Sequence, residues 1–387
     1  MVSVDAADSF VLTVARRNAS DPGGAYAAPL APRARPDSVH HSGVSIESLR
    51  PRLAHFASAV CGPRFTVEGL QVMEAGHAGL TFGFDLIDPK AGARRGLILK
   101  LAPPGVRRSG NTDVFRQAPL LRALWAAGLA VPDVPYASAG DEWFGTPFIM
   151  MERLAGQPFF VWEPDLAFDR AAAAVRPLWE QTVEAMAALH RFDWKLHLPD
   201  WEPPRVLADE VARWDLILDK SPQPGWISMG RAVRDRLLAT LPSGEPIGLV
   251  HGDCQPGNAL FNSGRLTGLI DWELASIGSR RIDAGWMMML ADRESWPADW
   301  RPLCPLAPDE VQTLYSAAVA ERCEDLPWYQ AYAGYRLGAI SCLNVHLHRS
   351  GRRPDATWER FAVAIPLLFA RAAAIVKRLP QTFRFSS

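Results

Sequence analysis

The feature that most constrains this 387-residue chain is the spacing of three polar side chains, Asp253, Asn258 and Asp271. An amide follows the first carboxylate by five residues, and a second carboxylate follows the amide by thirteen. In-line phosphoryl transfer needs such a set, because one carboxylate can take the proton of the attacking hydroxyl while two oxygen donors bind magnesium. The spacing therefore predicts a site for phosphoryl transfer.

Short apolar runs surround these residues. Residues 247–250 end at His251, so Asp253 should lie on a loop just after a strand, and the runs 259–261 and 266–270 predict two further strands. Two short strands would then flank one cleft. Each Asp or Asn taken alone could equally cap a turn or start a helix. Only the combination favours phosphoryl transfer.

The motif H-G-D-x-x-x-x-N at 251–258, followed by I-D-W-E at 270–273, resembles the aminoglycoside phosphotransferase and choline kinase-like family, whose fold is similar to that of protein kinases. It is most similar to the branch of kinase-like domains found with acyl-CoA dehydrogenases. The resemblance runs from about residue 76 to 335. It implies an α+β, two-lobed, protein-kinase-like fold, with a sheet-rich N-lobe at 44–154 and a mainly helical C-lobe at 155–387 that carries the catalytic loop and the acceptor site.

The resemblance also implies a role for each motif residue. Asp253 would be the catalytic base, and Asn258 and Asp271 would bind Mg²⁺. His251 would brace the loop, and Asp283 would cap a later helix and brace the same loop. The implied cofactors are ATP and Mg²⁺, and the implied partner is a small hydroxyl-bearing acceptor that is similar either to a hydroxyacyl-CoA or to an aminoglycoside.

The nucleotide site is predicted upstream. Strand patterns cover 65–73, 80–86 and 96–102, and the glycine-containing turn between the first two can lay backbone N–H groups over phosphates. Lys100 lies in an apolar strand, where an ammonium group needs a partner; it could instead face solvent on an edge strand. By resemblance, Lys100 binds the α and β phosphates, and backbone groups at about 151–154, at the end of an apolar strand at 145–154, meet adenine. The predicted nucleotide-binding residues are Gly76, His77, Ala78, Gly79, Lys100, Met151, Glu152 and Leu154.

Two positions depart from the family pattern. Gln117 stands where related proteins often have glutamate, so its side-chain oxygen could accept a hydrogen bond from Lys100 but could not neutralise it, and Glu74 is a possible substitute. Ser279 and Arg280 stand where the family usually has an Asp-Pro pair, which bears on the shape of that loop.

Several other residues invite a functional interpretation that the sequence does not favour. His190 ends a helical pattern and is better explained by packing than by catalysis. Cys254 is better explained as a buried, inert thiol than as a nucleophile. A cluster of basic residues surrounds Gly351. It is better explained as a solvated helix end than as a site for an anionic acceptor. Its members are His346, His348, Arg349, Arg352 and Arg353.

Composition narrows the partners. With 41 Lys plus Arg against 42 Asp plus Glu, the chain has no net field to attract nucleic acid or a membrane. The five cysteines lack metal-ligand spacing, which predicts a reduced, cytoplasmic protein. We expect no membrane anchor, because the longest apolar run, at 361–370, is short and contains a proline. We expect no secretory signal, because the N-terminus carries Asp5 and Asp8 instead of a basic segment that leads into an apolar one. Residues 1–43 are rich in Ala, Pro, Ser and Arg and predict a flexible extension. The oligomeric state is left open.

Two other classes of function compete with a small-molecule kinase. The chain could be a non-catalytic ATP-binding module, which the departure at Gln117 permits and the intact set of Asp253, Asn258 and Asp271 opposes. It could also be a metal-dependent hydrolase, but a metal-water centre would need more histidine ligands than this neighbourhood offers.

Overall fold

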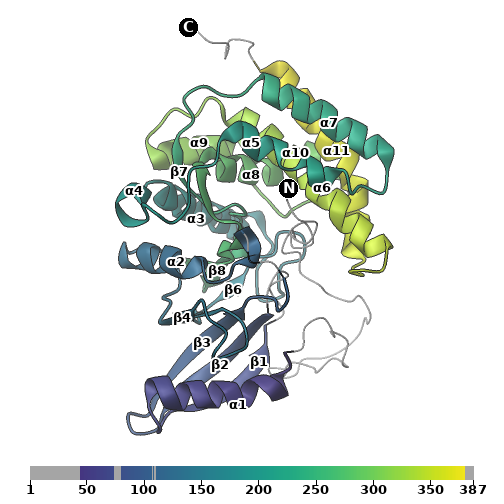
Figure 1. The fold of residues 1–387 in the computed structure, drawn as a ribbon. Coiled ribbons are helices and arrows are strands. Elements are labelled where there is room, and N and C mark those ends of the chain that lie inside the picture. The colour runs from purple at the N-terminus through teal and green to yellow at the C-terminus, as the bar shows by residue number, and fades with distance from the viewer. Residues whose placement is uncertain (1–43, 74–79, 107, 109, 380–387) are drawn as a thin grey trace, which may run out of the picture.

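The computed structural model describes residues 44–73, 80–106, 108 and 110–379. Its N-terminal part is a five-stranded antiparallel sheet of order β1-β2-β3-β5-β4 (Figure 1). The predicted extension at 1–43 and the glycine turn at 76–79, as well as Glu74, lie outside the described residues. The strands of the sheet are β1 Thr66–Val72, β2 Leu80–Asp88, β3 Ala93–Leu101, β4 Tyr136–Ser138 and β5 Phe148–Glu152.

One helix, α1 (Ile46–Phe56), covers a face of this sheet. It starts at Ser45, whose side chain accepts a hydrogen bond from the N–H of Ser48. Its apolar residues recur at helical spacing and pack on the buried leucines of β3, including Leu99. Because side chains alternate along a strand, Lys100 points to the opposite face. Lys100 lies between β2 and β5 in the sheet, so the interpretation of an exposed edge strand was wrong.

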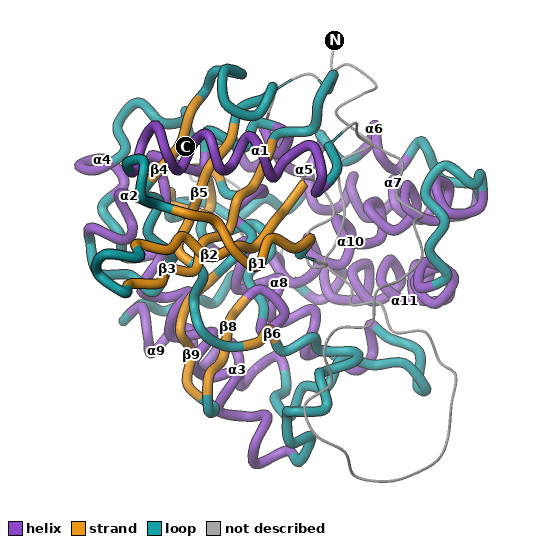
Figure 2. Tube along the Cα trace, turned by 90° about the horizontal axis from the view of Figure 1, so that it is seen from below, coloured by secondary structure: helices purple, strands orange, loops and turns teal. Residues whose placement is uncertain are grey.

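The C-terminal part is mainly helical and contains two small sheets, of order β6-β8-β9 and β10-β7. In both views α7, α10 and α11 run side by side (Figures 1 and 2). Nearly all of α10 is buried, as expected of a helix that is apolar on every side. The strands are β6 Gln157–Pro158, β7 Ile247–Val250, β8 Ala259–Asn262, β9 Arg265–Leu269 and β10 Ser276–Ser279. The helices are α2 Gln117–Ala126, α3 Ala172–His190, α4 Trp194–His197, α5 Leu207–Ala212, α6 Asp215–Leu218, α7 Pro224–Ala239, α8 Arg281–Ala291, α9 Pro308–Val319, α10 Leu326–Arg349 and α11 Thr357–Arg378.

The expected α+β architecture, with a sheet-rich N-terminal part and a helical C-terminal part, is confirmed. The boundary at 154 stays a prediction. All five cysteines are free thiols. Within the described ranges, no helix combines the length and the apolar character needed to cross a membrane.

Candidate active site

Two loops bring the predicted residues together. The catalytic loop, residues 251–258, follows β7 and ends in a 3₁₀ turn, while the second loop, residues 270–274, follows β9. The carbonyl of Asn258 accepts a hydrogen bond of 2.9 Å from the N–H of Ile270. The side chain of His251 reaches the carbonyl of Ile270 at 3.0 Å. These two bonds hold the loops side by side, so residues distant in sequence line one site.

Asp253 is held by two amides and is only 4% exposed. Gln255 Nε2 donates to Oδ1 at 2.8 Å, and Asn258 Nδ2 donates to Oδ2 at 2.9 Å. Burial, followed by the negative charge of Asp271, raises the pKa of Asp253 to about 7 against the opposing effects of Arg336 and the amides. A pKa near neutrality suits a general base. Sequence reasoning missed Gln255, which only its place two residues after the base could have indicated.

Asn258 and Asp271 present oxygen atoms that suit a hard cation. Because Asn258 Nδ2 donates to Asp253, its Oδ1 faces away, and this buried oxygen has no hydrogen-bond partner among the described residues. Leaving a buried acceptor unpaired costs about 1–3 kcal/mol. Asp271 has a left-handed backbone (φ 65°), a strained conformation of the kind that clusters at functional sites. A magnesium ion fits this pair, because it commonly takes one or two protein oxygens and completes its shell with phosphates and water.

Lys100, 6% exposed, makes ion pairs with two acids of the second loop. Its Nζ lies 3.4 Å from Asp271 Oδ1 and 3.3 Å from Glu273 Oε2. Burial alone would lower the pKa of Lys100, but the two carboxylates raise it above its ordinary value. Gln117, the first residue of α2, is not among the acceptors of the Lys100 ammonium, which donates to Asp271 and Glu273. The buried Nε2 of Gln117 has no partner in the described part of the chain.

Glu273 is the functional residue that sequence reasoning left without a role, although it belongs to the I-D-W-E motif. It is 5% exposed and shares Lys100 with Asp271. Burial and the charge of Asp271 raise the pKa of Glu273 to about 8, and Lys100 opposes this shift. Three carboxylates and one ammonium therefore meet in a buried space, so the site carries more negative than positive charge.

Asp283 supports the catalytic loop from α8. Its carboxylate accepts hydrogen bonds from the backbone N–H of His251 at 2.7 Å and of Gly252 at 2.8 Å. The prediction that Asp283 caps its own helix was wrong. The helix α8 begins at Arg281, so Asp283 lies inside its first turn. His190 contacts Asp283 at 3.1 Å and the hydroxyl of Tyr315 at 2.8 Å, which fits the structural role expected of it.

His251 is held as a neutral imidazole. Burial lowers its pKa, although the nearby carboxylates oppose the shift. The carbonyl of Ile270 requires a proton on Nε2, and Nδ1 then accepts from the N–H of Asp253 at 3.3 Å. The ring thus fixes the backbone on both sides of the site.

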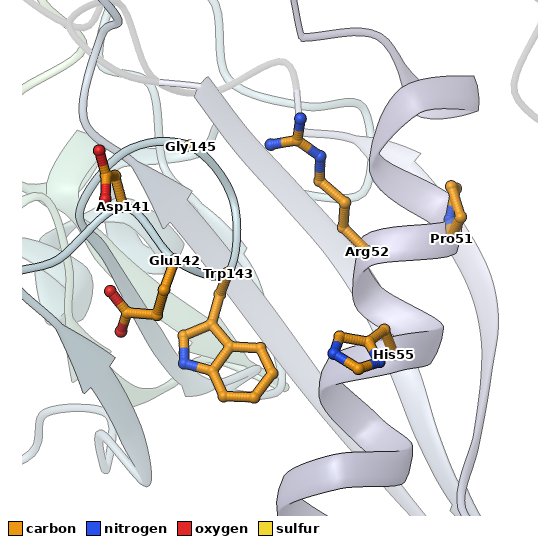
Figure 3. A pocket seen from close by; sticks show the side chains of 7 residues that line it. All are labelled: Pro51, Arg52, His55, Asp141, Glu142, Trp143 and Gly145. Atoms are coloured by element: carbon orange, nitrogen blue, oxygen red, sulfur yellow. The ribbon is translucent and has the colours of Figure 1, made fainter.

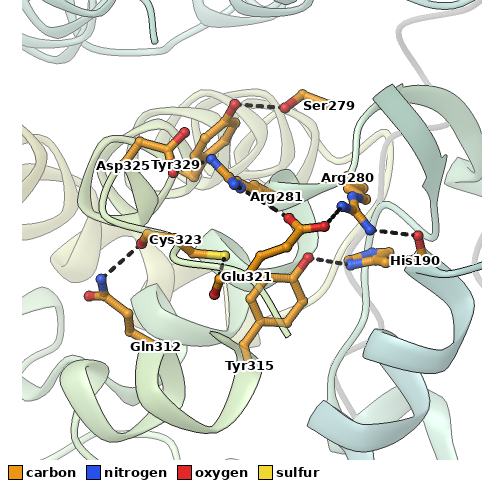
Figure 4. Close-up of polar contacts among 10 residues, drawn as sticks. All are labelled: His190, Ser279, Arg280, Arg281, Gln312, Tyr315, Glu321, Cys323, Asp325 and Tyr329. Atoms are coloured by element: carbon orange, nitrogen blue, oxygen red, sulfur yellow. Dashed lines mark hydrogen bonds and ion pairs between the residues drawn. The ribbon is translucent and has the colours of Figure 1, made fainter. Parts of the chain in front are cut away.

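The second departure from the family pattern forms its own polar network (Figure 4). Ser279 and Tyr329 share a hydrogen bond of 2.7 Å between their hydroxyl groups. Arg280 donates to the carbonyl of His190 at 2.8 Å and makes an ion pair with Glu321. An arginine therefore ties this loop to α3 and to the segment before α10.

The segment predicted to meet adenine has backbone groups that are already bonded within the protein. Met151 lies opposite Ile98 in the sheet, and the N–H of Glu152 donates to the carbonyl of Asp133 at 2.8 Å. Leu154 packs beside Gly268 of β9.

A separate open hollow of about 440 Å³ lies between α1 and the 141–145 loop (Figure 3). No predicted site residue lines this hollow.

Two other sequence candidates have structural explanations. Cys254 is buried, and burial raises the pKa of its thiol well above the ordinary value, so the sulfur stays protonated. In the basic cluster Arg349 makes a two-pronged ion pair with Glu359 at 2.8 and 2.7 Å, and His348 Nδ1 accepts from the N–H of Asp355 at 2.8 Å. Part of that cluster is therefore satisfied within the protein.

Comparisons with known proteins identify the family of this chain. The sequence matches the phosphotransferase enzyme family (APH) over residues 86–308. It is 25% identical over 190 residues to acyl-CoA dehydrogenase family member 11 of Gallus gallus, covering 48% of this chain and 24% of that protein. It is 30% identical over 181 residues to a homoserine kinase of Afipia carboxidovorans, covering 44% and 49%. The chain thus spans about a quarter and about half of the length of these relatives.

Solved structures share the fold. A putative aminoglycoside phosphotransferase from Ralstonia eutropha superposes with a TM-score of 0.66 at 18% identity, over 86% of this chain and 98% of that one. A thermostable mutant of aminoglycoside phosphotransferase APH(4)-Ia, in ternary complex with ADP and hygromycin B, gives 0.56 at 16% identity, over 85% and 98%. These likenesses show the kinase-like fold that the motifs implied. Because the family match covers more than half of the sequence, this chain belongs to the phosphotransferase enzyme family.

Proposed function

We propose that this chain transfers the γ-phosphoryl group of ATP to a hydroxyl group of a small molecule. The observation that carries the proposal is the meeting of Asp253, Asn258, Asp271 and Lys100 in one buried site. Family membership supports it, as do the relative named as a homoserine kinase and the neighbour bound to ADP and hygromycin B, an acceptor with hydroxyl groups.

Asp253 takes the proton of the acceptor hydroxyl as the new O–P bond forms. The two amides fix the plane of its carboxylate, so its remaining lone pairs keep a defined direction. With a pKa of about 7, Asp253 can be ionised before the reaction and can hold the proton afterwards. Proton transfer to a positioned group contributes typically about 10²- to 10⁴-fold to the rate.

Asn258 Oδ1 and Asp271 would hold magnesium, since one is a buried oxygen without a partner and the other a carboxylate beside it in a site rich in negative charge. When bound, Mg²⁺ supplies charge neutralisation on the phosphates. Lys100 binds the α and β phosphates, and Glu273 keeps its ammonium in place from the other side. His251 and Asp283 keep the catalytic loop in shape.

The division of labour follows the two lobes. The N-lobe at 44–154 binds the nucleotide, with Gly76 to Gly79 over the phosphates and the backbone of Met151, Glu152 and Leu154 at adenine. The C-lobe at 155–387 supplies the catalytic loop and the acceptor site. The five unpaired thiols fit a reducing compartment, for which the cytoplasm is our proposal.

A screen for ADP release against a library of alcohols tests the proposal. We expect Asp253→Asn to lower turnover by about 100-fold or more, with little change in ATP affinity. Asp309→Asn, at an exposed position in α9, is the matched control and should keep full turnover. Excess EDTA should stop the reaction. Near-native turnover by a folded Asp253→Asn protein, or turnover that survives EDTA, would contradict the roles assigned. ATP binding without ADP release for any alcohol would favour the non-catalytic module.

A further inference from the structure

Arg336, in the middle of α10, makes no ion pair with any residue that the structure describes. It is 4% exposed and lies between two indole rings, with its guanidinium carbon 5.0 Å from the ring centre of Trp214 and 4.9 Å from that of Trp286. Among the described residues it makes no hydrogen bond or ion pair, and its buried Nε is unsatisfied. Arginine stays protonated in proteins. Stacking on two rings offsets only part of the cost of burying such a charge.

The nearest network of charges does not supply the missing acceptor. Glu210 interacts electrostatically with Arg336, but its oxygens are taken by other groups. It accepts from the hydroxyl of Tyr332 at 2.8 Å and from Arg213 at 3.0 Å, and it pairs with Arg205 at 3.6 Å. Arg205 also pairs with Glu202 at 3.7 Å. Of the three arginines around Glu210, Arg336 is the one that makes no ion pair with a described residue.

This surplus positive charge lies on the catalytic side of the lobe. The guanidinium of Arg336 interacts electrostatically with the carboxylate of Asp253. Trp286 belongs to α8, the helix that braces the catalytic loop through Asp283, and its buried Nε1 also has no hydrogen-bond partner in the described part of the chain. Two neighbouring buried donors therefore lack an acceptor. An oxyanion is the group that both donors can bind.

We propose that Arg336 binds an oxyanion of the phosphate acceptor, a carboxylate or a phosphate, and so places the acceptor hydroxyl at Asp253. The planar guanidinium can hold two oxygens of such a group at once, which fixes orientation as well as position. This inference rests on the proposed function and narrows it to hydroxy acids or phosphorylated alcohols. The basic cluster at 346–353 is a different place, because at about 1.5 Å per residue it begins about 15 Å further along α10.

Matched pairs of acceptors test the inference. The pairs are 3-hydroxybutyrate with 3-hydroxybutyramide, and glycerol 3-phosphate with glycerol; the first tests a carboxylate and the second a phosphate. In the native protein we expect the anionic member of at least one pair to have a kcat/KM at least about tenfold higher, as a two-pronged charged contact predicts. Arg336→Gln should abolish that preference, Arg336→Lys should keep part of it, and the KM for ATP should stay within about twofold.

Two controls separate binding from folding. Arg349→Gln removes an arginine of the same helix that is already paired with Glu359, and it should leave the preference intact. Because Arg336 makes no hydrogen bond or ion pair within the described residues, and burying its charge costs more than the stacking returns, Arg336→Gln should not lower the melting temperature of the ligand-free protein. Glu210→Gln, which removes the charge paired with Arg213, should lower it.

Several results would overturn the inference. The first is an equal kcat/KM for both members of each pair in the native protein, and the second is a preference for the anionic member that survives Arg336→Gln. The third is an equal loss of kcat/KM for anionic and neutral acceptors in Arg336→Gln, with a shifted pH profile. That result would mean that Arg336 acts only on Asp253. If the native protein phosphorylates neutral alcohols without discrimination, the proposed function stands and this inference fails. If no alcohol in the library causes ADP release, the proposed function fails, and this inference fails with it.

Discussion

Replacing Glu273 with glutamine should remove a pH dependence that burial imposes on the ligand-free protein. The pKa of Glu273 is about 8 in the folded state and has an ordinary value of 4.5. Between these two values the folded chain holds a proton that the unfolded chain has released, so the free energy of unfolding falls as the pH rises. One such proton is worth about 1.4 kcal/mol for each pH unit. From pH 5.5 to 7.5 the native protein should therefore lose about 2–3 kcal/mol that the glutamine variant keeps.

Denaturant unfolding at pH 5.5, 6.5 and 7.5, in EDTA and without nucleotide, measures this difference. The quantity to follow is the free energy of unfolding of the native protein minus that of the variant, because the contributions of groups that titrate alike in both proteins then cancel. Glutamine has nearly the same shape as glutamate and can still accept a hydrogen bond from Lys100, so packing changes little. Glu324→Gln, at an exposed ion pair with Arg322, is the control and should give a flat difference. A flat difference for Glu273→Gln, or one that rises with pH in favour of the native protein, would refute the reasoning.

Two further substitutions probe the support of the site. Asp283→Ala leaves two buried backbone N–H groups of the catalytic loop without their acceptor. It should therefore lower the free energy of unfolding, measured by denaturant titration, by about 2–5 kcal/mol and should reduce turnover. Asp283→Asn should have a smaller effect on both. Gly285→Ala would drive a Cβ into the backbone carbonyl of Tyr329 and push α8 from α10, so the melting temperature should fall by several degrees. Gly225→Ala, with open space around it, should not destabilise the protein. A melting temperature unchanged by Gly285→Ala would contradict this packing.

The part of the site that sequence predicted depends on local chemistry. A strand that ends at Val250 and a 3₁₀ turn at Pro256–Asn258 follow from short apolar runs and from Pro and Gly, so the position of Asp253 between them is set within a few residues. Lys100 could be recognised because a charge inside an apolar strand demands a partner. Such signals lie in one stretch of chain and can be read there.

The part that sequence did not predict depends on contacts between distant segments. Lys100 and Glu273 are 173 residues apart, and nothing near either residue shows that they meet. The departure at Gln117 indicated only that the usual partner was missing. Arg336 is harder still, because an arginine in a helix is normally exposed, and only the packing of α10 between Trp214 and Trp286 reveals that its charge is buried.

The amide at position 117 and the acid at position 273 can be understood together. The site already holds the carboxyl groups of Asp253, Asp271 and Glu273 beside the ammonium of Lys100, and burial, followed by the charge of Asp271, raises the pKa of Asp253 to about 7. A glutamate at 117, the position from which related kinases supply the partner of the lysine, would add a fourth negative charge. That charge would raise the pKa of Asp253 further and leave less of the base ionised at neutral pH. Because Glu273 already pairs with Lys100, the lysine keeps a partner although the side chain at 117 is neutral. A neutral side chain also leaves the pKa of Asp253, the proposed base, where it can be ionised at neutral pH.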